Sequence, residues 1–106
     1  MALVALHTRL APGKEEEYEA AHAVIPPELD EALRAAGVRD WSIWRDGLDL
    51  FHLVDVDDYR AMRLALRDHP ANIAWQARMA ELLDVPDDYS GTDTGLRHVW
   101  RLRPAG

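Results

Sequence analysis

The sequence has 106 residues, enough for a single hydrophobic core and too few for two, so we predict one domain over residues 1–106. The 48% of apolar and 29% of charged residues exclude a disordered or fibrous chain, and the absence of cysteine excludes disulfides, thiolate nucleophiles and cysteine-bound metal centres. Because the net charge is −7 and basic residues are scattered among acidic ones, the chain is expected to bind no nucleic acid.

Residues 2–10, ALVALHTRL, have the composition of a first β-strand. This opening segment lacks the basic lead and the cleavage site of a secretory signal. No apolar run in the sequence approaches the roughly 18 residues that span a bilayer. We therefore expect a cytoplasmic protein with no membrane partner.

Two helical pieces are predicted after this strand. In residues 11–22 a Pro-Gly pair is followed by a run of glutamates, which suits the N-terminus of a helix. Pro26 and Pro27 cannot continue that helix, but proline can begin one. Residues 26–37 therefore form a second piece that ends at Gly37, and the first connection between strands is a broken helix.

Residues 38–56 contain two β-rich runs joined by Arg-Asp-Gly, a strong signal for a β-hairpin. Two further helical pieces are predicted over residues 59–68 and 69–83, and either Asp57 or Asp58 can cap the first of them. Residues 84–95 read as a polar, turn-rich loop, and residues 96–103, LRHVWRLR, as a closing strand.

The predicted order β-α-β-β-α-β is that of the ferredoxin-like fold, an α+β fold in which a four-stranded antiparallel sheet carries its helices on one face. Large side chains on both sides of the predicted strands indicate that the other face meets a partner subunit instead of water. We expect a homodimer, with room for a small ligand between the sheet and its partner.

Tyr18 and His22 lie four residues apart on the first predicted helix, so their side chains are neighbours. Imidazole, with an ordinary pKa of about 6.5, can give or take a proton near neutral pH, and the phenol can hold a hydroxyl or share the proton. The alternative is that both rings pack against other residues at the end of the helix, with only their polar atoms exposed to water.

Four tryptophans fall in three different predicted elements, and an indole face is a good platform for the apolar face of a sugar. Packing in the core explains any of them as well. For Trp75 both interpretations stay open because a polar residue follows it, and for Trp44 the core is favoured.

His7, His52 and His98 each lie on a predicted strand, so a three-histidine metal site would require all three on one face. Strand histidines more often make one hydrogen bond in a mixed interior, and we predict no metal site. The acidic runs are solvated helix starts, and neither a glycine-rich phosphate loop nor a Ser-His-Asp signature is present.

Several segments together resemble the L-rhamnose mutarotase family over almost the full length. They are EEYEAAHAVIPPEL at residues 16–29, WSIW at 41–44, AWQARM at 74–79, VPDD at 85–88 and VWRLRP at 99–104. The resemblance implies a dimeric α+β barrel that interconverts the α and β anomers of a 6-deoxy sugar without a metal or organic cofactor. It also implies that His22 is the acid/base, that Tyr18 holds the anomeric region and that Trp75 lies against the sugar.

The chain departs from the pattern of the family at three positions. Trp41 stands where the family usually has a tyrosine, and Gln76 where it has the second tryptophan of a pair, so both are predicted to bind the substrate with a different hydrogen-bond pattern. Arg101 replaces a residue that is commonly aromatic.

The function is therefore predicted to be mutarotation of L-rhamnose or a related monosaccharide. The first alternative is a cyclase, isomerase or monooxygenase that uses the same scaffold on a hydrophobic biosynthetic intermediate, since fold alone does not fix function. The second is a non-catalytic sugar-binding module. The identity of the sugar and the oxygen that His22 would protonate stay open.

Overall fold

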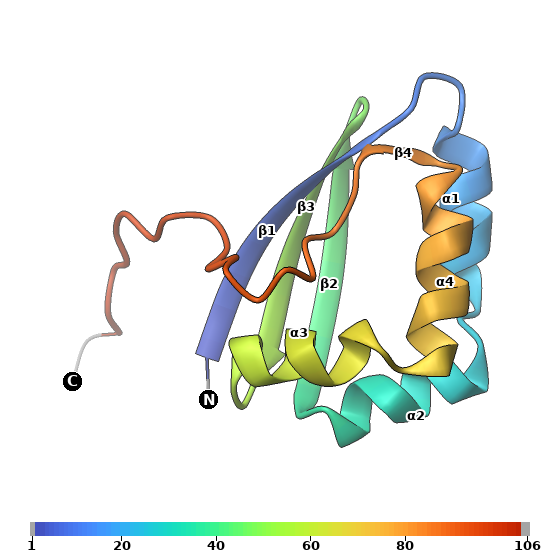
Figure 1. The fold of residues 1–106 in the computed structure, drawn as a ribbon. Coiled ribbons are helices and arrows are strands. Elements are labelled where there is room, and N and C mark those ends of the chain that lie inside the picture. The colour runs from blue at the N-terminus through green and yellow to red at the C-terminus, as the bar shows by residue number, and fades with distance from the viewer. Residues whose placement is uncertain (1, 105–106) are drawn as a thin grey trace.

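The computed structural model describes residues 2–104 as a four-stranded sheet with all helices on one of its faces (Figure 1). Along the chain the elements are β1 Ala2–Leu10, α1 Glu15–Ala23, α2 Pro27–Ala35, β2 Val38–Asp46, β3 Asp49–Val56, α3 Tyr59–Arg67, α4 Pro70–Ala80 and β4 Leu83–Val85. The strand order is β2-β3-β1-β4, with every neighbouring pair antiparallel, which confirms the predicted ferredoxin-like class. Within residues 2–104 no helix has the length and apolar character needed to cross a bilayer.

Proline and two capping side chains fix where the later helices begin. Pro27 is the first residue of α2, so the chain must turn after α1 before it can become helical again. At the start of α3, Asp58 Oδ1 accepts the N–H of Ala61 at 2.9 Å. At the start of α4, His69 Nδ1 accepts the N–H of Ala71 at 3.1 Å. Both helical connections are broken as predicted, and Asp58 is the cap of α3.

The strands alternate between a face that packs on the helices and an open face. On β3, buried residues alternate with the exposed Phe51 and Leu53. The register sets Trp41 of β2 opposite Val54, which is fully buried, and Trp44 opposite Phe51. Trp44 is therefore on the open face and is 58% exposed, so the prediction that it is a core residue is wrong. The reason is the two-residue period of a strand, which sends it to the side opposite Trp41.

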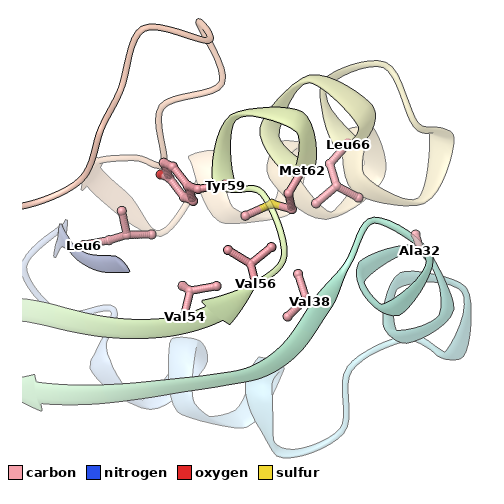
Figure 2. Packing of buried hydrophobic residues seen from close by; sticks show 8 residues of the cluster. All are labelled: Leu6, Ala32, Val38, Val54, Val56, Tyr59, Met62 and Leu66. Carbon is pink, nitrogen blue, oxygen red and sulfur yellow. The ribbon is translucent and has the colours of Figure 1, made fainter. Parts of the chain in front are cut away.

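Two hydrophobic clusters fill the space between the sheet and the helices. The first packs strand residues against α3 and is shown in Figure 2; its buried members are Leu6, Ala32, Val38, Val54, Val56, Tyr59, Met62 and Leu66. The second lies under α1 and α4; its buried members are Leu10, Tyr18, Ala21, Leu29, Leu50, Trp75, Met79 and Leu82. Because Tyr18 and Trp75 belong to the second cluster, core packing itself fixes two of the predicted site residues.

The fourth strand is not where the sequence predicts it. β4 is the short segment that directly follows α4, and it pairs with β1 at Arg9 and Leu10. Residues 96–103, predicted to be the closing strand, form no strand. The element order is that of the prediction, but the last strand comes earlier and is shorter.

The segment 96–103 makes a single backbone hydrogen bond to the sheet and pairs with no strand. The N–H of Leu96 donates to the carbonyl of Ala5 at 2.7 Å, and beyond this contact the chain runs away from the sheet (Figure 1). On the side of β1 away from β3, β4 pairs only with Arg9 and Leu10, and Leu96 bonds Ala5. A β-rich composition forms a strand only beside a partner strand. The apolar side chains of Val99, Trp100 and Leu102 are consequently exposed.

Candidate functional site

All five predicted site residues line one cavity. Tyr18 and His22 come from α1, Trp41 from β2, and Trp75 and Gln76 from α4. The cavity has a volume of about 480 Å³, a size typical of small-ligand sites. It lies between the sheet and the helices of the same chain, whereas the sequence interpretation placed the room for a ligand between the sheet and a partner subunit.

The hydrogen bond made by His22 determines which ring nitrogen can act as a base. Its Nδ1 lies 2.9 Å from the backbone carbonyl of Tyr18, and a carbonyl can only accept, so Nδ1 carries the proton. Nε2 is then left with a lone pair. The ring of Tyr18 packs on the imidazole with centroids 4.1 Å apart, and the ring of Trp75 meets it edge to face at 5.1 Å. The imidazole is held by one hydrogen bond and two aromatic rings.

Burial sets the protonation states of this pair. Desolvation lowers the pKa of His22, and the Tyr18 carbonyl and the charge of Asp87 offset only part of that effect. Desolvation, with a contribution from the negative charge of Asp87, raises the pKa of Tyr18 well above its usual range. At neutral pH the site therefore presents a neutral imidazole that can accept a proton and a phenol that keeps its own.

Trp41 is held by a second histidine. Its indole Nε1–H donates to His52 Nδ1 at 3.0 Å, and because the indole can only donate, His52 must carry its proton on Nε2. That nitrogen lies 2.8 Å from the hydroxyl of Thr8, which accepts from it. Trp41 therefore has no N–H left for a ligand and offers the cavity its ring alone.

Gln76 belongs to an amide and phenol cluster on the α4 side of the cavity. Its Nε2 donates to Asn72 Oδ1 at 3.3 Å and to the Tyr89 hydroxyl at 3.4 Å. Asn72 is buried and is itself anchored by its Nδ2, which donates to the carbonyl of Leu66 at 3.0 Å. The side chain of Gln76 is thus oriented by its neighbours, with its amide oxygen available to a hydroxyl donor.

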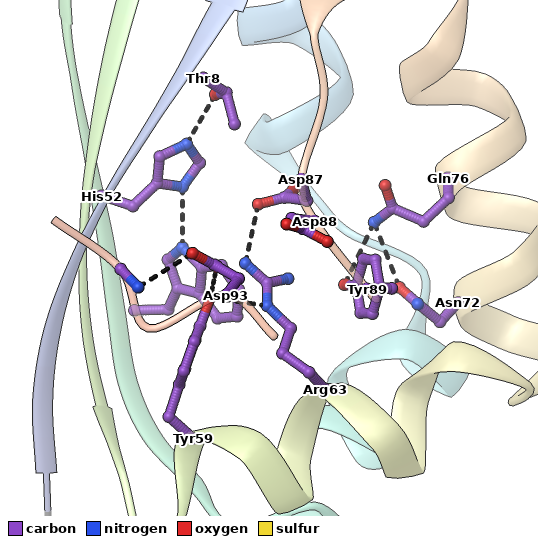
Figure 3. A network of polar contacts seen from close by, with 12 residues as sticks. Thr8, His52, Tyr59, Arg63, Asn72, Gln76, Asp87, Asp88, Tyr89 and Asp93 are labelled. Atoms are coloured by element: carbon purple, nitrogen blue, oxygen red, sulfur yellow. Dashed lines mark hydrogen bonds and ion pairs between the residues drawn. The ribbon is translucent and has the colours of Figure 1, made fainter. Parts of the chain in front are cut away.

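An ion pair at the cavity wall was missed by the sequence analysis. Arg63 on α3 is 1% exposed, and its Nη2 donates to Asp87 Oδ1 at 3.1 Å (Figure 3). Its Nε donates to the hydroxyl of Tyr59, which in turn donates to Asp93. Asp87 and Asp93 lie in the polar loop that was assigned no role. The only signal in the sequence was the VPDD segment, whose first aspartate lines the cavity.

The histidines considered for a metal site do not come together. His7 pairs with Phe51 across the sheet and bonds Asp49 on the open face, whereas His52 faces the helices. His98 lies in the exposed segment that leaves the sheet. Neighbouring strand residues point to opposite faces, which separates His7 from His52.

Comparison with known proteins adds independent findings. A family model described as L-rhamnose mutarotase matches residues 3–102. An L-rhamnose mutarotase from Burkholderia orbicola (strain MC0-3) is 38% identical, with 96% of this chain and 99% of that protein covered. One from Sinorhizobium medicae (strain WSM419) is 36% identical, with 97% and 100% covered.

Solved structures agree with the fold. The crystal structure of an L-rhamnose mutarotase from Formosa agariphila superposes with a TM-score of 0.77 at 25% identity, covering 97% of this chain and all of that one (100%). Tetracenomycin F2 cyclase from Streptomyces glaucescens, a type-II polyketide cyclase, superposes with a TM-score of 0.64 at 22% identity, covering 97% of this chain and 100% of that one. The likeness to the cyclase shows a common fold alone.

Proposed function

This chain belongs to the L-rhamnose mutarotase family, and we propose that it interconverts the α and β anomers of L-rhamnose with His22 as its acid/base. The observation that carries the assignment is the convergence of a neutral imidazole and a protonated phenol in one cavity. An anomer interconversion is an isomerase reaction, and it needs nothing beyond these two kinds of group.

The chemistry of mutarotation follows from proton transfers alone. Ring opening takes a proton from the C1 hydroxyl, breaks the bond between C1 and the ring oxygen, and delivers a proton to that oxygen. Rotation about the C1–C2 bond and closure on the other face of the carbonyl reverse both transfers. In our proposal His22 Nε2 takes the proton of the C1 hydroxyl and delivers it to the ring oxygen, and ring closure reverses this transfer. The Tyr18 hydroxyl donates a hydrogen bond to an oxygen of the anomeric region. No electron or group is transferred to another molecule.

The remaining predicted residues hold the sugar. The rings of Trp75 and Trp41 supply flat apolar surfaces for the C–H face of the pyranose, and the amide oxygen of Gln76 accepts from a hydroxyl. Because Trp41 donates its N–H to His52, it contributes contact area alone at the position where the family usually has a tyrosine.

The test is NMR saturation transfer between the α and β anomeric protons of L-rhamnose. We expect the wild-type protein to accelerate exchange and His22→Ala to lower kcat by about 10²- to 10⁴-fold, the usual contribution of a general acid/base. Tyr18→Phe should cause a smaller loss, because it removes one hydroxyl and keeps the ring that packs on the imidazole.

His98→Ala is the matched control, since it removes a histidine from the exposed segment outside the cavity. The thermal unfolding of each variant shows whether the fold is kept. Full anomer exchange by a folded His22→Ala protein would refute the assignment. Binding of L-rhamnose without any acceleration by the wild type would favour the sugar-binding module, and the absence of both would favour an unrelated substrate.

The assembly of the protein and its location in the cell are two further predictions. We infer a homodimer that meets through the open sheet face, because Leu3, Trp44, Phe51 and Leu53 expose apolar surface there. A cytoplasmic location would be tested by fractionation of the producing cells.

A further inference from the structure

Asp87 is the one carboxylate among the residues that line the cavity. It lies just after β4, and its side chain is 13% exposed. Oδ1 accepts from Arg63 Nη2 at 3.1 Å. The hydrogen bond and the ion pair that Asp87 makes among residues 2–104 both use Oδ1, so Oδ2 is left for a ligand at the border of the cavity that holds His22. A partly buried carboxylate with one oxygen fixed and the other open is suited to accept hydrogen bonds from a ligand.

Arg63 is built to hold this carboxylate in place. Its guanidinium carbon lies 4.5 Å from the ring centroid of Tyr89, 5.1 Å from that of Tyr59 and 5.7 Å from that of Trp41. Its Nε is fixed by the Tyr59 hydroxyl at 2.9 Å, as Figure 3 shows. The cation therefore sits among three aromatic rings, and its ion pair among the described residues is with Asp87.

A role in packing does not account for this pair. Replacing a buried ion pair by apolar side chains of similar volume is often neutral or stabilising, so charge at this depth is a poor device for stability. Arg63 Nη1 is also buried without a partner among the described residues, so the protein alone does not satisfy the guanidinium. What the pair does provide is an ionised, oriented acceptor at the wall of the cavity.

We propose that Asp87 is a substrate-binding residue whose free carboxylate oxygen accepts hydrogen bonds from sugar hydroxyls away from the reacting centre, and that Arg63 is its positioning residue. The proposal rests on the sugar mutarotase function proposed above. A carboxylate can accept from two neighbouring hydroxyls at once, and such charge-assisted bonds are stronger than those to an amide. The arrangement selects neutral, polyhydroxylated sugars, because the carboxylate of an acidic sugar would meet a negative charge.

The first experiment compares Asp87→Asn with Asp88→Asn by NMR saturation transfer on L-rhamnose at pH 8. Asp88 is exposed and lies outside the cavity, so its variant is the matched control for loss of one charge in this loop. We expect Asp87→Asn to raise KM by roughly tenfold to a hundredfold, the value of a hydrogen bond to a charged group, and to change kcat by less than about threefold. Asp88→Asn should change neither.

An unchanged KM in a folded Asp87→Asn protein would overturn the proposal, and so would a loss confined to kcat. The wild-type rate separates this failure from failure of the proposed function: if the wild type does not accelerate exchange, the mutarotase assignment fails, whatever Asp87 does. In case Asp87→Asn does not fold, the ¹³C carboxyl signals of the wild-type aspartates are followed during titration with L-rhamnose. The Asp87 signal should shift while that of Asp88 stays; no shift at Asp87 would overturn the proposal.

The role of Arg63 is tested by a double-mutant cycle with Arg63→Lys and Asp87→Asn. If Arg63 acts through Asp87, Arg63→Lys raises KM in the wild-type background and has no further effect on KM in the Asp87→Asn background. A purely structural role would lower the unfolding temperature equally in both backgrounds and leave the two effects on KM additive, which would overturn the assignment of Arg63 as a positioning residue.

Discussion

At the scale of single residues, the hydrogen bond between His22 Nδ1 and the carbonyl of Tyr18 is the decisive contact. It lies within one helical turn, so the same residues that form α1 also fix the tautomer of the base. Hydrogen bonding to the carbonyl favours the protonated ring, but burial opposes it more strongly, so the imidazole is neutral at rest. A base that stays neutral near pH 7 can accept a proton without first losing one.

The pH dependence of catalysis follows from these shifts. Since the neutral imidazole is the active form and burial lowers the pKa of His22, kcat/KM should fall toward acidic pH with a midpoint below about 6.5, the ordinary value. Tyr18, whose pKa burial raises, should cause no loss up to about pH 10. The measurement is the rate of anomer exchange against pH after subtraction of the uncatalysed rate.

The variant Asp87→Asn tests whether the acidic limb of this pH profile reports the pKa of His22. The negative charge of Asp87 raises the pKa of His22, while the positive charge of Arg78 lowers it. Removing the carboxylate should therefore move the acidic limb to lower pH. An acidic limb centred above pH 6.5 in the wild type, or one that moves upward in Asp87→Asn, would contradict this account of the site.

At the scale of elements, the loop from residue 86 to residue 95 brings Asp87 and Tyr89 to the cavity, and its end is fixed on β1. Gly95 has φ +80°, and a Cβ there would lie 2.5 Å from Val4 Cγ1 and 2.9 Å from the Ala5 carbonyl oxygen. The next residue donates its N–H to that same carbonyl. Glycine at this position lets the loop lie against the strand at a distance that no other residue allows.

Gly95→Ala should consequently damage both stability and binding. A positive φ alone costs an alanine about 1–2 kcal/mol, and the contact with a strand backbone adds to that cost. The displaced loop should also weaken binding of L-rhamnose through Asp87. Chemical denaturation gives the free energy of unfolding, and ligand titration gives the affinity.

Gly13→Ala is the matched control, because Gly13 has φ +84° with nothing within 4 Å of an added Cβ. Its free energy of unfolding should fall only by the cost of the positive φ, and its affinity for the sugar should be unchanged. Equal losses of stability in the two variants would mean that the close approach of the loop to β1 does not contribute to the cost of Gly95→Ala.

At the scale of the whole molecule, the two faces of the sheet have different surroundings. The helices cover one face of the sheet (Figure 1). They enclose the cavity on that side, while the other face is left with exposed apolar side chains. Large apolar patches on a protein of this size mark interaction surfaces. The dimer proposed above would bury this face and leave the cavity, which lies on the helix side, inside each subunit.

The double variant Trp44→Asp, Phe51→Asp tests this assembly. Both side chains are on the open face, so each substitution would bury a carboxylate in the proposed interface, and the dissociation constant of the dimer should rise by at least about tenfold. Light scattering coupled to size exclusion should give twice the chain mass of 12.0 kDa for the wild type and a smaller average for the variant.

Ile73→Asp is the control, since Ile73 is exposed to a similar extent but lies on α4, in the helix layer. It should leave the mass unchanged. A wild type that runs as a monomer, or a loss of the dimer on Ile73→Asp alone, would refute the open face as the interface.

The sequence by itself determined the features that depend on neighbouring residues. Pro27 breaks the first helical connection, one of the two aspartates Asp57 and Asp58 caps α3, and the four-residue spacing of Tyr18 and His22 brings their rings together. Each of these results from backbone geometry within one or two turns, which the order of residues specifies directly. The order of elements, and with it the fold class, could be predicted for the same reason.

Only the tertiary structure decided which distant residues meet. The pairing of Arg63 with Asp87 and of Trp41 with His52 depends on strand register and on the path of a loop, and neither has a periodic signal in the sequence. The segment 96–103 has the composition of a strand, but an edge for it to pair with is a property of the assembled sheet. Local order fixes elements, whereas the site forms where packing brings those elements together.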